Sequence, residues 1–221
     1  MKKDITDGNG IYFDGVVIDF EGLRDTDSSK KPILYSGKTI STYFTDFLTE
    51  LKAELSPLGK KLYVAVNVRE YFDGFNYTDI LKVADRVIIM AHSYDPGSSV
   101  KISKNHVLQY TGEKTTKVNS LAPIQKVQKA LTDMQTSASD PADLKKVWLQ
   151  ICFDSAQWKF DVNSPEGWTK LSESALCKSK ASPSYKSLKE LVDNANGNAK
   201  KLTYGYNTVL QSPFIQYFNA S

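Results

Sequence analysis

Residues 14–21 read Asp-Gly-Val-Val-Ile-Asp-Phe-Glu, a short apolar stretch that ends in two acidic residues. The run of Val and Ile predicts a buried β-strand. Because side chains alternate between the two faces of a strand, Asp19 and Glu21 should share one face while Phe20 lies on the other. Two carboxylates at the end of a buried strand are costly unless a site uses them, so this pair indicates a functional site.

The composition is that of a soluble globular protein with a sizeable core. Of 221 residues, 41% are hydrophobic and 24% charged, with a formal net charge of +3. This charge is small and no basic run is interleaved with aromatic residues, so no nucleic-acid partner is expected. The sequence contains neither the roughly 20 apolar residues of a membrane span nor a signal-peptide pattern. Cys152 and Cys177 fit neither a disulfide framework nor a zinc site, and no metal or cofactor is expected.

After residue 21 the sequence alternates between helical and strand patterns. Helices are predicted over residues 44–55, with Ser41 or Thr42 as the cap, and over 77–84 and 123–134; buried strands are predicted over 62–67, 87–90 and 147–154. Alternating strands and helices form either a (β/α)8 barrel or an open doubly wound sheet. No Gly-x-Gly-x-x-Gly or P-loop sequence supports a nucleotide-binding sheet, which favours the barrel.

From residue 155 onward the pattern changes, and Ser, Lys, Asn and Pro become frequent. A helix is predicted over residues 184–194 and paired strands are predicted within 202–217. These elements stand outside the alternation of strands and helices. We therefore expect residues 1–154 to form part of an α/β barrel and residues 155–221 to form a small α+β insertion.

The stretch at residues 14–21 resembles the signature of glycoside hydrolase family 18, Asp-Gly-x-Asp-x-Asp-x-Glu, which ends the fourth strand of a (β/α)8 barrel. Four residues match it: Asp14, Gly15, Asp19 and Glu21. Val17 stands at the position of the innermost acid. The variant is most similar to the chitinase-like bacterial branch that trims spore-cortex and cell-wall glycan. The resemblance implies that the chain comprises about strands four to seven, followed by an insertion that walls one side of the sugar groove.

In that family the Glu protonates the glycosidic oxygen, and the substrate's own 2-acetamido carbonyl attacks the anomeric carbon. The resemblance thus implies a retaining hydrolase of β-1,4-linked N-acetylglucosamine-containing glycan, such as chitin or peptidoglycan. Glu21 would be the general acid and Asp19 would orient the acetamido group. The resemblance also implies an extracellular, cell-wall or spore-associated location and an oligosaccharide or polysaccharide as the partner.

Later strand ends carry further candidate residues. The family's sixth strand ends in Met-x-Tyr-Asp, and here Met90 matches while His92 and Ser93 replace the Tyr and the Asp. The branch's seventh strand leads to Tyr-Gly-Tyr-Asp-Trp, and Trp158 stands in the place of the Trp. The resemblance implies that five residues bind the substrate: Met90, His92, Tyr94, Asp154 and Trp158.

Other interpretations stay open. The replacements at Val17, His92 and Ser93 favour a catalytically inert glycan-binding or scaffold domain on the same fold. Asp19 and Glu21 could also be two solvated acids at a strand end, or ligands of a hard cation, although no other acid clearly joins them. The presence of both acids favours catalysis, because a binding domain needs no proton donor at the glycosidic oxygen.

Overall fold

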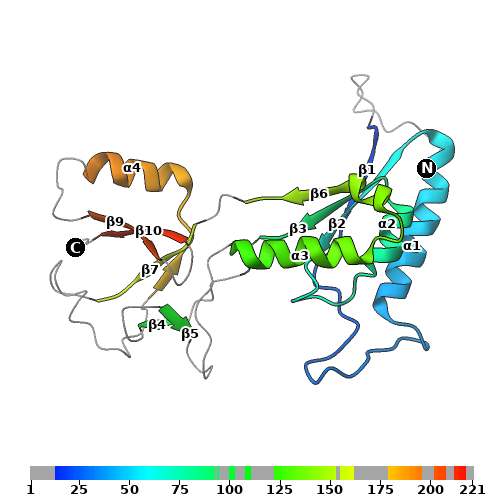
Figure 1. Ribbon diagram of the computed structural model, residues 1–221, viewed down its shortest axis with the longest axis horizontal. Helices are drawn as coiled ribbons and strands as arrows, with labels where there is room; N and C mark the ends of the chain where they lie inside the picture. The colour runs from blue at the N-terminus through cyan, green and yellow to red at the C-terminus, as the bar shows by residue number, and fades with distance from the viewer. Residues whose placement is uncertain are drawn as a thin grey trace. The chain divides into compact units, whose positions relative to one another are not determined.

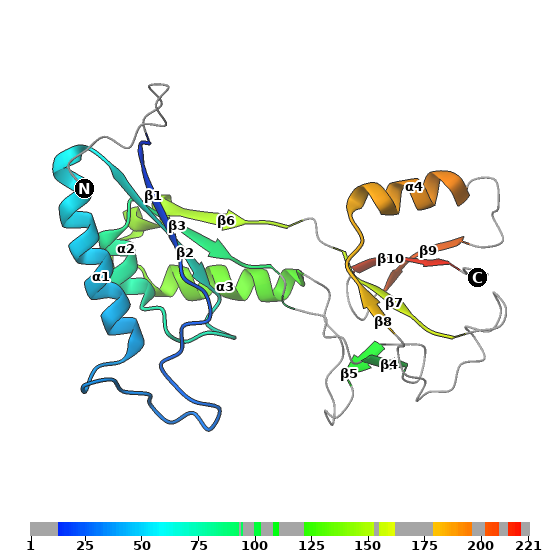
Figure 2. The same cartoon turned by 180° about the vertical axis from the view of Figure 1, so that it is seen from behind.

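The computed structural model describes residues 13–92, 94, 100–102, 108–110, 122–152, 155–161, 179–195, 202–207 and 212–217. The chain divides into two compact units. The first comprises Met1–Ala91 and Val127–Ile151, and the second comprises His92–Lys126 and Cys152–Ser221. A parallel sheet forms the centre of the first unit, whereas the described strands of the second unit form antiparallel pairs (Figures 1 and 2).

The sheet of the first unit has four parallel strands in the order β1-β2-β3-β6 (Figure 1). The strands are β1 (Gly15–Asp19), β2 (Lys61–Asn67), β3 (Arg86–Met90) and β6 (Val147–Gln150). The connections contain the helices α1 (Ile40–Leu55), α2 (Tyr77–Val83) and α3 (Ile124–Ser137), and the short 3-10 helices Ser56–Leu58 and Pro141–Lys146. A doubly wound sheet reverses its strand order at a switch point. The described strands follow chain order without reversal, as in part of a (β/α) barrel.

The helices bury one face of this sheet. Val64 of β2 and Val87 of β3 are paired neighbours, and neither side chain is accessible to solvent. The apolar core residues of these helices are Phe44 and Leu48 from α1, Tyr77, Ile80 and Leu81 from α2, and Val127, Ala130 and Met134 from α3. Their spacing places them on one stripe of each helix, and burying a large apolar side chain stabilises the fold by roughly 1.5–3 kcal/mol. No helix in the described part of the chain has the length and apolar character needed to cross a membrane.

Helix α1 begins at Ile40, ahead of both residues that the sequence suggested as its cap. Its N-cap is Thr39, whose side-chain oxygen accepts a hydrogen bond from the backbone N–H of Thr42. The prediction of Ser41 or Thr42 as the cap is wrong, because Asp25 engages Ser41 instead. The Ser41 N–H donates to Asp25 Oδ1 at 2.8 Å, and its hydroxyl donates to Oδ2. The loop between β1 and α1 is thereby tied to the first turn of α1.

In the second unit, β4 (Val100–Ile102) pairs with β5 (Leu108–Tyr110), β7 (Gln157–Lys159) with β8 (Ser179–Ala181), and β9 (Leu202–Asn207) with β10 (Ser212–Tyr217). The helix α4 (Tyr185–Ala195) lies within this unit. The helix and the paired strands predicted near the C-terminus are confirmed. Residues 92–126 group with this unit, although the sequence analysis placed them with the barrel. The α+β insertion of residues 155–221 stays a prediction.

Asp85 links the beginnings of two strands to the end of α1. Its Oδ2 accepts hydrogen bonds from Lys52 Nζ at 2.6 Å and from the Leu62 N–H at 2.8 Å. Lys61 Nζ lies 3.9 Å from Oδ1. Burial raises the pKa of this carboxyl, but the hydrogen bonds from Lys52 and Leu62 and the charges of both lysines outweigh burial. The pKa of Asp85 is therefore lowered, and the ionised form stabilises the fold.

We expect Asp85→Asn to lower the free energy of unfolding of the full-length protein at pH 7 by about 1–3 kcal/mol. Because the pKa of Asp85 is lower in the folded than in the unfolded state, its contribution is complete above about pH 4 and is lost as the pH falls through the folded value. The difference from wild type should stay nearly constant from pH 7 to about pH 4 and shrink at lower pH. Denaturant unfolding at several pH values measures it.

Asp46→Asn is the matched control, since Asp46 pairs with Lys38 at 2.9 Å but both side chains are about half exposed. An exposed pair of this kind contributes about 0–1 kcal/mol. A cost at Asp85 no larger than that at Asp46, or one that does not change with pH, would contradict the role given to Asp85.

Candidate active site

The two acids of the motif lie at the C-terminal end of β1. Asp19 is the last residue of the strand, Glu21 follows two residues later, and both side chains are exposed. Phe20 packs against α1, with its ring centroid 5.7 Å from that of Phe47 and 5.8 Å from that of Phe44. Asp19 therefore lies on the face opposite α1. The structure places the acid pair at the strand end that carries the catalytic residues in (β/α) barrels.

The face that carries Asp19 continues onto the neighbouring strands. Asp19 pairs with Ala65 of β2, and Asn67, two residues further along β2, pairs with Met90 of β3. Paired residues of parallel strands point to the same face of the sheet, so these four residues share one face. Met90, a predicted substrate-binding residue, is 7% exposed. Asp19, Asn67 and Met90 are the last residues of β1, β2 and β3, so all three lie at the C-terminal end of the parallel sheet.

Val17 lies on this face two residues before Asp19 and is 57% exposed. An apolar side chain thus lies on the face of Asp19, at the position where the resemblance implies an acid. Within the described residues, no group of three or more His, Cys, Asp or Glu side chains could hold a metal ion. Two neighbouring carboxyl groups such as Asp19 and Glu21 can donate a proton and form hydrogen bonds.

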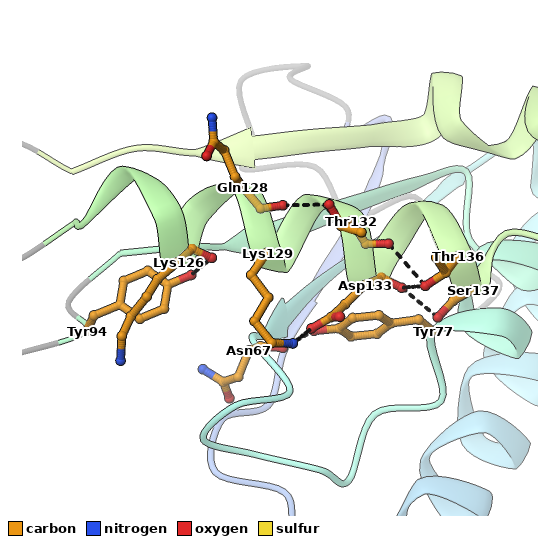
Figure 3. Close-up of polar contacts among 10 residues, drawn as sticks. All are labelled: Asn67, Tyr77, Tyr94, Lys126, Gln128, Lys129, Thr132, Asp133, Thr136 and Ser137. Atoms are coloured by element: carbon orange, nitrogen blue, oxygen red, sulfur yellow. Dashed lines mark hydrogen bonds and ion pairs between the residues drawn. The ribbon is translucent and has the colours of Figure 1, made fainter.

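The turn that follows Glu21 is held by Asn67. Asn67 Oδ1 accepts a hydrogen bond from the Gly22 N–H at 3.0 Å. The backbone carbonyl of Asn67 accepts a second hydrogen bond, at 2.6 Å, from the hydroxyl of Tyr77. Tyr77 is fully buried at the start of α2, and Figure 3 shows its ring together with Asn67. The end of β2 is thus anchored to α2 on one side and to the turn after the acid on the other.

Asp73 holds the next part of the same loop. Its Oδ1 accepts hydrogen bonds from the N–H groups of Asp25 at 2.9 Å and Thr26 at 3.4 Å, and its Oδ2 accepts from the Thr26 hydroxyl. Burial raises the pKa of Asp73, but these hydrogen bonds outweigh burial and the pKa is lowered. Sequence reasoning missed both Asn67 and Asp73 as functional candidates. The available signal for Asn67 was its place as a polar residue at the end of the strand that follows the motif strand.

The remaining predicted residues belong to the second unit or lie outside the described residues. Tyr94 is 4% exposed, its hydroxyl donates to the Lys126 carbonyl at 3.1 Å, and the Lys126 ammonium lies 5.7 Å from the ring centroid (Figure 3). His92 and Trp158 are partly buried, with Trp158 in β7. Ser93 and Asp154 lie outside the described residues. That these side chains bind one substrate together with Asp19 and Glu21 stays a prediction.

No protein-family model matches the chain, and no curated protein matches its sequence. Several solved structures do match its fold. The C-terminal domain of a putative chitinase from Desulfitobacterium hafniense has 20% sequence identity and a TM-score of 0.61, and the match covers 93% of this chain and 52% of that one. The spore cortex-lytic enzyme of Bacillus megaterium has 15% identity and a TM-score of 0.57, with 94% and 37% covered. A glycoside hydrolase family 18 N-acetylglucosaminidase from Paenibacillus barengoltzii has 13% identity and a TM-score of 0.53, with 92% and 56% covered.

These matches cover nearly all of the chain but only part of each solved structure. The chain spans about half the length of the Desulfitobacterium domain and little more than a third of the Bacillus enzyme. At these levels of identity the likeness concerns the fold. The chain thus corresponds to part of the fold of chitinase-like proteins, glycoside hydrolase family 18 among them. The assignment of its strands as the fourth to seventh of a barrel stays a prediction.

Proposed function

We propose that this chain carries the catalytic acid of a glycoside hydrolase that cleaves β-1,4-linked N-acetylglucosamine-containing glycan with retention at the anomeric carbon. The observation that carries the proposal is the pair Asp19 and Glu21 at the exposed end of β1, in a fold similar to that of chitinases. Fold alone does not decide function, since barrels of this kind host many chemistries. The motif residues at the strand end therefore supply the argument.

In the first step Glu21 donates its proton to the glycosidic oxygen while the bond from that oxygen to the anomeric carbon breaks. The carbonyl oxygen of the substrate's 2-acetamido group attacks the anomeric carbon from the opposite side and closes a cyclic oxazolinium ion. Asp19, on the face opposite α1, accepts a hydrogen bond from the acetamido N–H and stabilises the positive charge of the ring.

In the second step a water molecule attacks the anomeric carbon and opens the oxazolinium ring. The Glu21 carboxylate takes a proton from this water, which regenerates the acid for the next cycle. Each step inverts the anomeric carbon, so the product retains the configuration of the substrate. Apart from this water, the two steps use only groups of the substrate and the carboxyl groups of Asp19 and Glu21.

The proposal extends to where the protein acts. Chitin and peptidoglycan lie outside the cytoplasm, and one similar structure is that of a spore cortex-lytic enzyme. We therefore place the protein outside the cell, at the cell wall or at the spore. The partner at this site is an oligosaccharide or polysaccharide chain.

A second candidate is a catalytically inert glycan-binding domain on the same fold. Val17, an exposed apolar side chain on the face of Asp19, favours it, because no carboxyl group occupies that position to share a proton with Asp19. The substitutions at His92 and Ser93 point the same way. The two candidates differ in one observable, which is turnover.

The proposed function predicts cleavage that depends on the N-acetyl group. The full-length protein should release reducing ends from N-acetylglucosamine oligomers and from none of the fully deacetylated oligomers of the same length, because the acetamide is the nucleophile. A reducing-end assay on the two series measures this. Binding of the acetylated oligomers without release would identify the inert binder, and equal cleavage of both series would exclude the substrate-assisted mechanism.

A further inference from the structure

Residues 22–26, which follow Glu21 directly, each contact the segment of residues 67–74, which runs from the last residue of β2 into the loop before α2. Asn67 binds Gly22, and Asp73 binds the two residues at the other end of the stretch. Between them, the carbonyl of Leu23 accepts a hydrogen bond from the Gly74 N–H at 3.0 Å. The guanidinium carbon of Arg24 lies 4.6 Å from the centre of the Phe72 ring. The backbone after Glu21 is therefore fixed residue by residue.

The two loops approach each other so closely at Gly74 that only a glycine fits. A Cβ atom at Gly74 would lie 2.5 Å from the carbonyl carbon of Leu23 and 2.6 Å from the backbone nitrogen of Arg24. Gly22 needs a glycine for another reason, since its φ of +77° lies in the left-handed region. The first residue after Glu21 thus turns the chain sharply, and Asn67 accepts the N–H of that residue.

We propose that Asn67 is a positioning residue for Glu21, acting through its hydrogen bond to the Gly22 N–H. This inference rests on the proposed role of Glu21 as proton donor. Glu21 is exposed and has a long, flexible side chain, so the direction of its carboxyl group depends on the backbone that carries it. A misplacement of about 1 Å at a catalytic group can cost about 100-fold in rate. Asn67 binds Gly22, which is the residue directly after Glu21 in the chain.

Hydrogen exchange tests the contact itself in the full-length protein, independently of activity. Asn67→Ala removes the acceptor, and the Gly22 amide should then exchange about 2- to 13-fold faster, as expected for the loss of one hydrogen bond. Asn67→Asp keeps an oxygen acceptor in the same place and should exchange like wild type. Mass spectrometry of peptides that contain Gly22 gives the rates. An unchanged rate in Asn67→Ala would overturn the proposal.

Asn76→Ala is the matched control. Asn76 is the N-cap of α2 and accepts from the Asp79 N–H at 3.3 Å, so its loss costs about 0.5–2 kcal/mol of stability. The described contacts of its side chain lie within the start of α2. This variant should leave the exchange of the Gly22 amide and the turnover number unchanged.

Turnover on N-acetylglucosamine oligomers tests the consequence. Asn67→Ala should lower kcat by about 10- to 100-fold with KM nearly unchanged, and Asn67→Asp should recover most of this loss. Faster Gly22 exchange with an unchanged kcat would overturn the positioning role, as would an equal loss in Asn76→Ala. If the wild-type protein showed no turnover, both the proposed function and this inference would be overturned. If the wild type were active and Asn67→Ala fully active too, only this inference would be overturned.

Discussion

Replacing Glu21 by Gln should reduce the turnover of N-acetylglucosamine oligomers by about 10²- to 10⁴-fold, the usual contribution of a well-placed general acid. Gln has nearly the same shape as Glu but no acidic proton to donate. Because Glu21 is an exposed side chain at a strand end, the substitution removes no core packing. The affinity for the oligomer should therefore remain nearly unchanged. Single-turnover kinetics and calorimetric binding to the full-length protein measure the two quantities.

Glu50→Gln is the control for this substitution, because Glu50 is an exposed Glu of α1 on the same unit. It should leave both turnover and affinity as in wild type. If Glu21→Gln kept full turnover, another group would have to donate the proton, and the role assigned to Glu21 would be wrong. If the wild type bound the oligomers without cleaving them, the inert binder would be the correct assignment.

Gly15→Ala should have the largest effect on stability. A Cβ atom at Gly15 would lie 2.1 Å from the carbonyl oxygen of Lys61, which is main chain of the neighbouring strand β2. The Lys61 N–H also donates to the Asp14 carbonyl at 2.8 Å, so the two strands are fixed at this point. A methyl group here must push β1 away from β2. We expect a loss at or above the ~3 kcal/mol upper end of the range for overpacked sites.

Gly59→Ala separates this close approach from ordinary backbone strain. Gly59 has a φ of +66° and no neighbouring atom within 4 Å of its Cβ position, so Ala there should cost only about 1–2 kcal/mol. Denaturant unfolding of the full-length variants gives both values. A Gly15→Ala protein as stable as Gly59→Ala would show that β1 and β2 are not paired in this register. The expected result explains physically why the motif has a glycine at its second position.

The sheet and its helices could be predicted because their side-chain patterns are local. The apolar runs at residues 62–67 and 87–90 are those of strands buried on at least one side, and the structure has β2 and β3 there. The predicted strand over residues 147–154 is observed only to Gln150. Its neighbour β3 ends at Met90, which is paired with Gln150, so no described backbone continues the ladder beyond that point.

Features that depend on contacts distant in sequence could not be predicted. Thr39, Ser41 and Thr42 are all suitable N-cap residues for α1. Thr39 is the cap in the structure. Ser41 instead donates a hydrogen bond to Asp25, which is sixteen residues away in the sequence. The three-residue strands of the second unit are too short to show a periodic pattern.

The same reasoning applies to the candidate site. The motif placed Asp19 and Glu21 at a strand end because strand and acids lie within eight residues. Asn67 is 45 residues from Gly22, and only the pairing of β1 with β2 brings its strand end beside the acids. No local pattern could connect the two.

The most direct test of Glu21 as proton donor compares two leaving groups in the Glu21→Gln protein. One substrate is an N-acetylglucosamine oligomer, and the other is a 2,4-dinitrophenyl N-acetylglucosaminide, whose leaving group departs without protonation. The rate of the first turnover should fall by about 10²- to 10⁴-fold on the oligomer and stay close to wild type for release of dinitrophenolate. Equal losses on both substrates would contradict the assignment of Glu21 as the general acid.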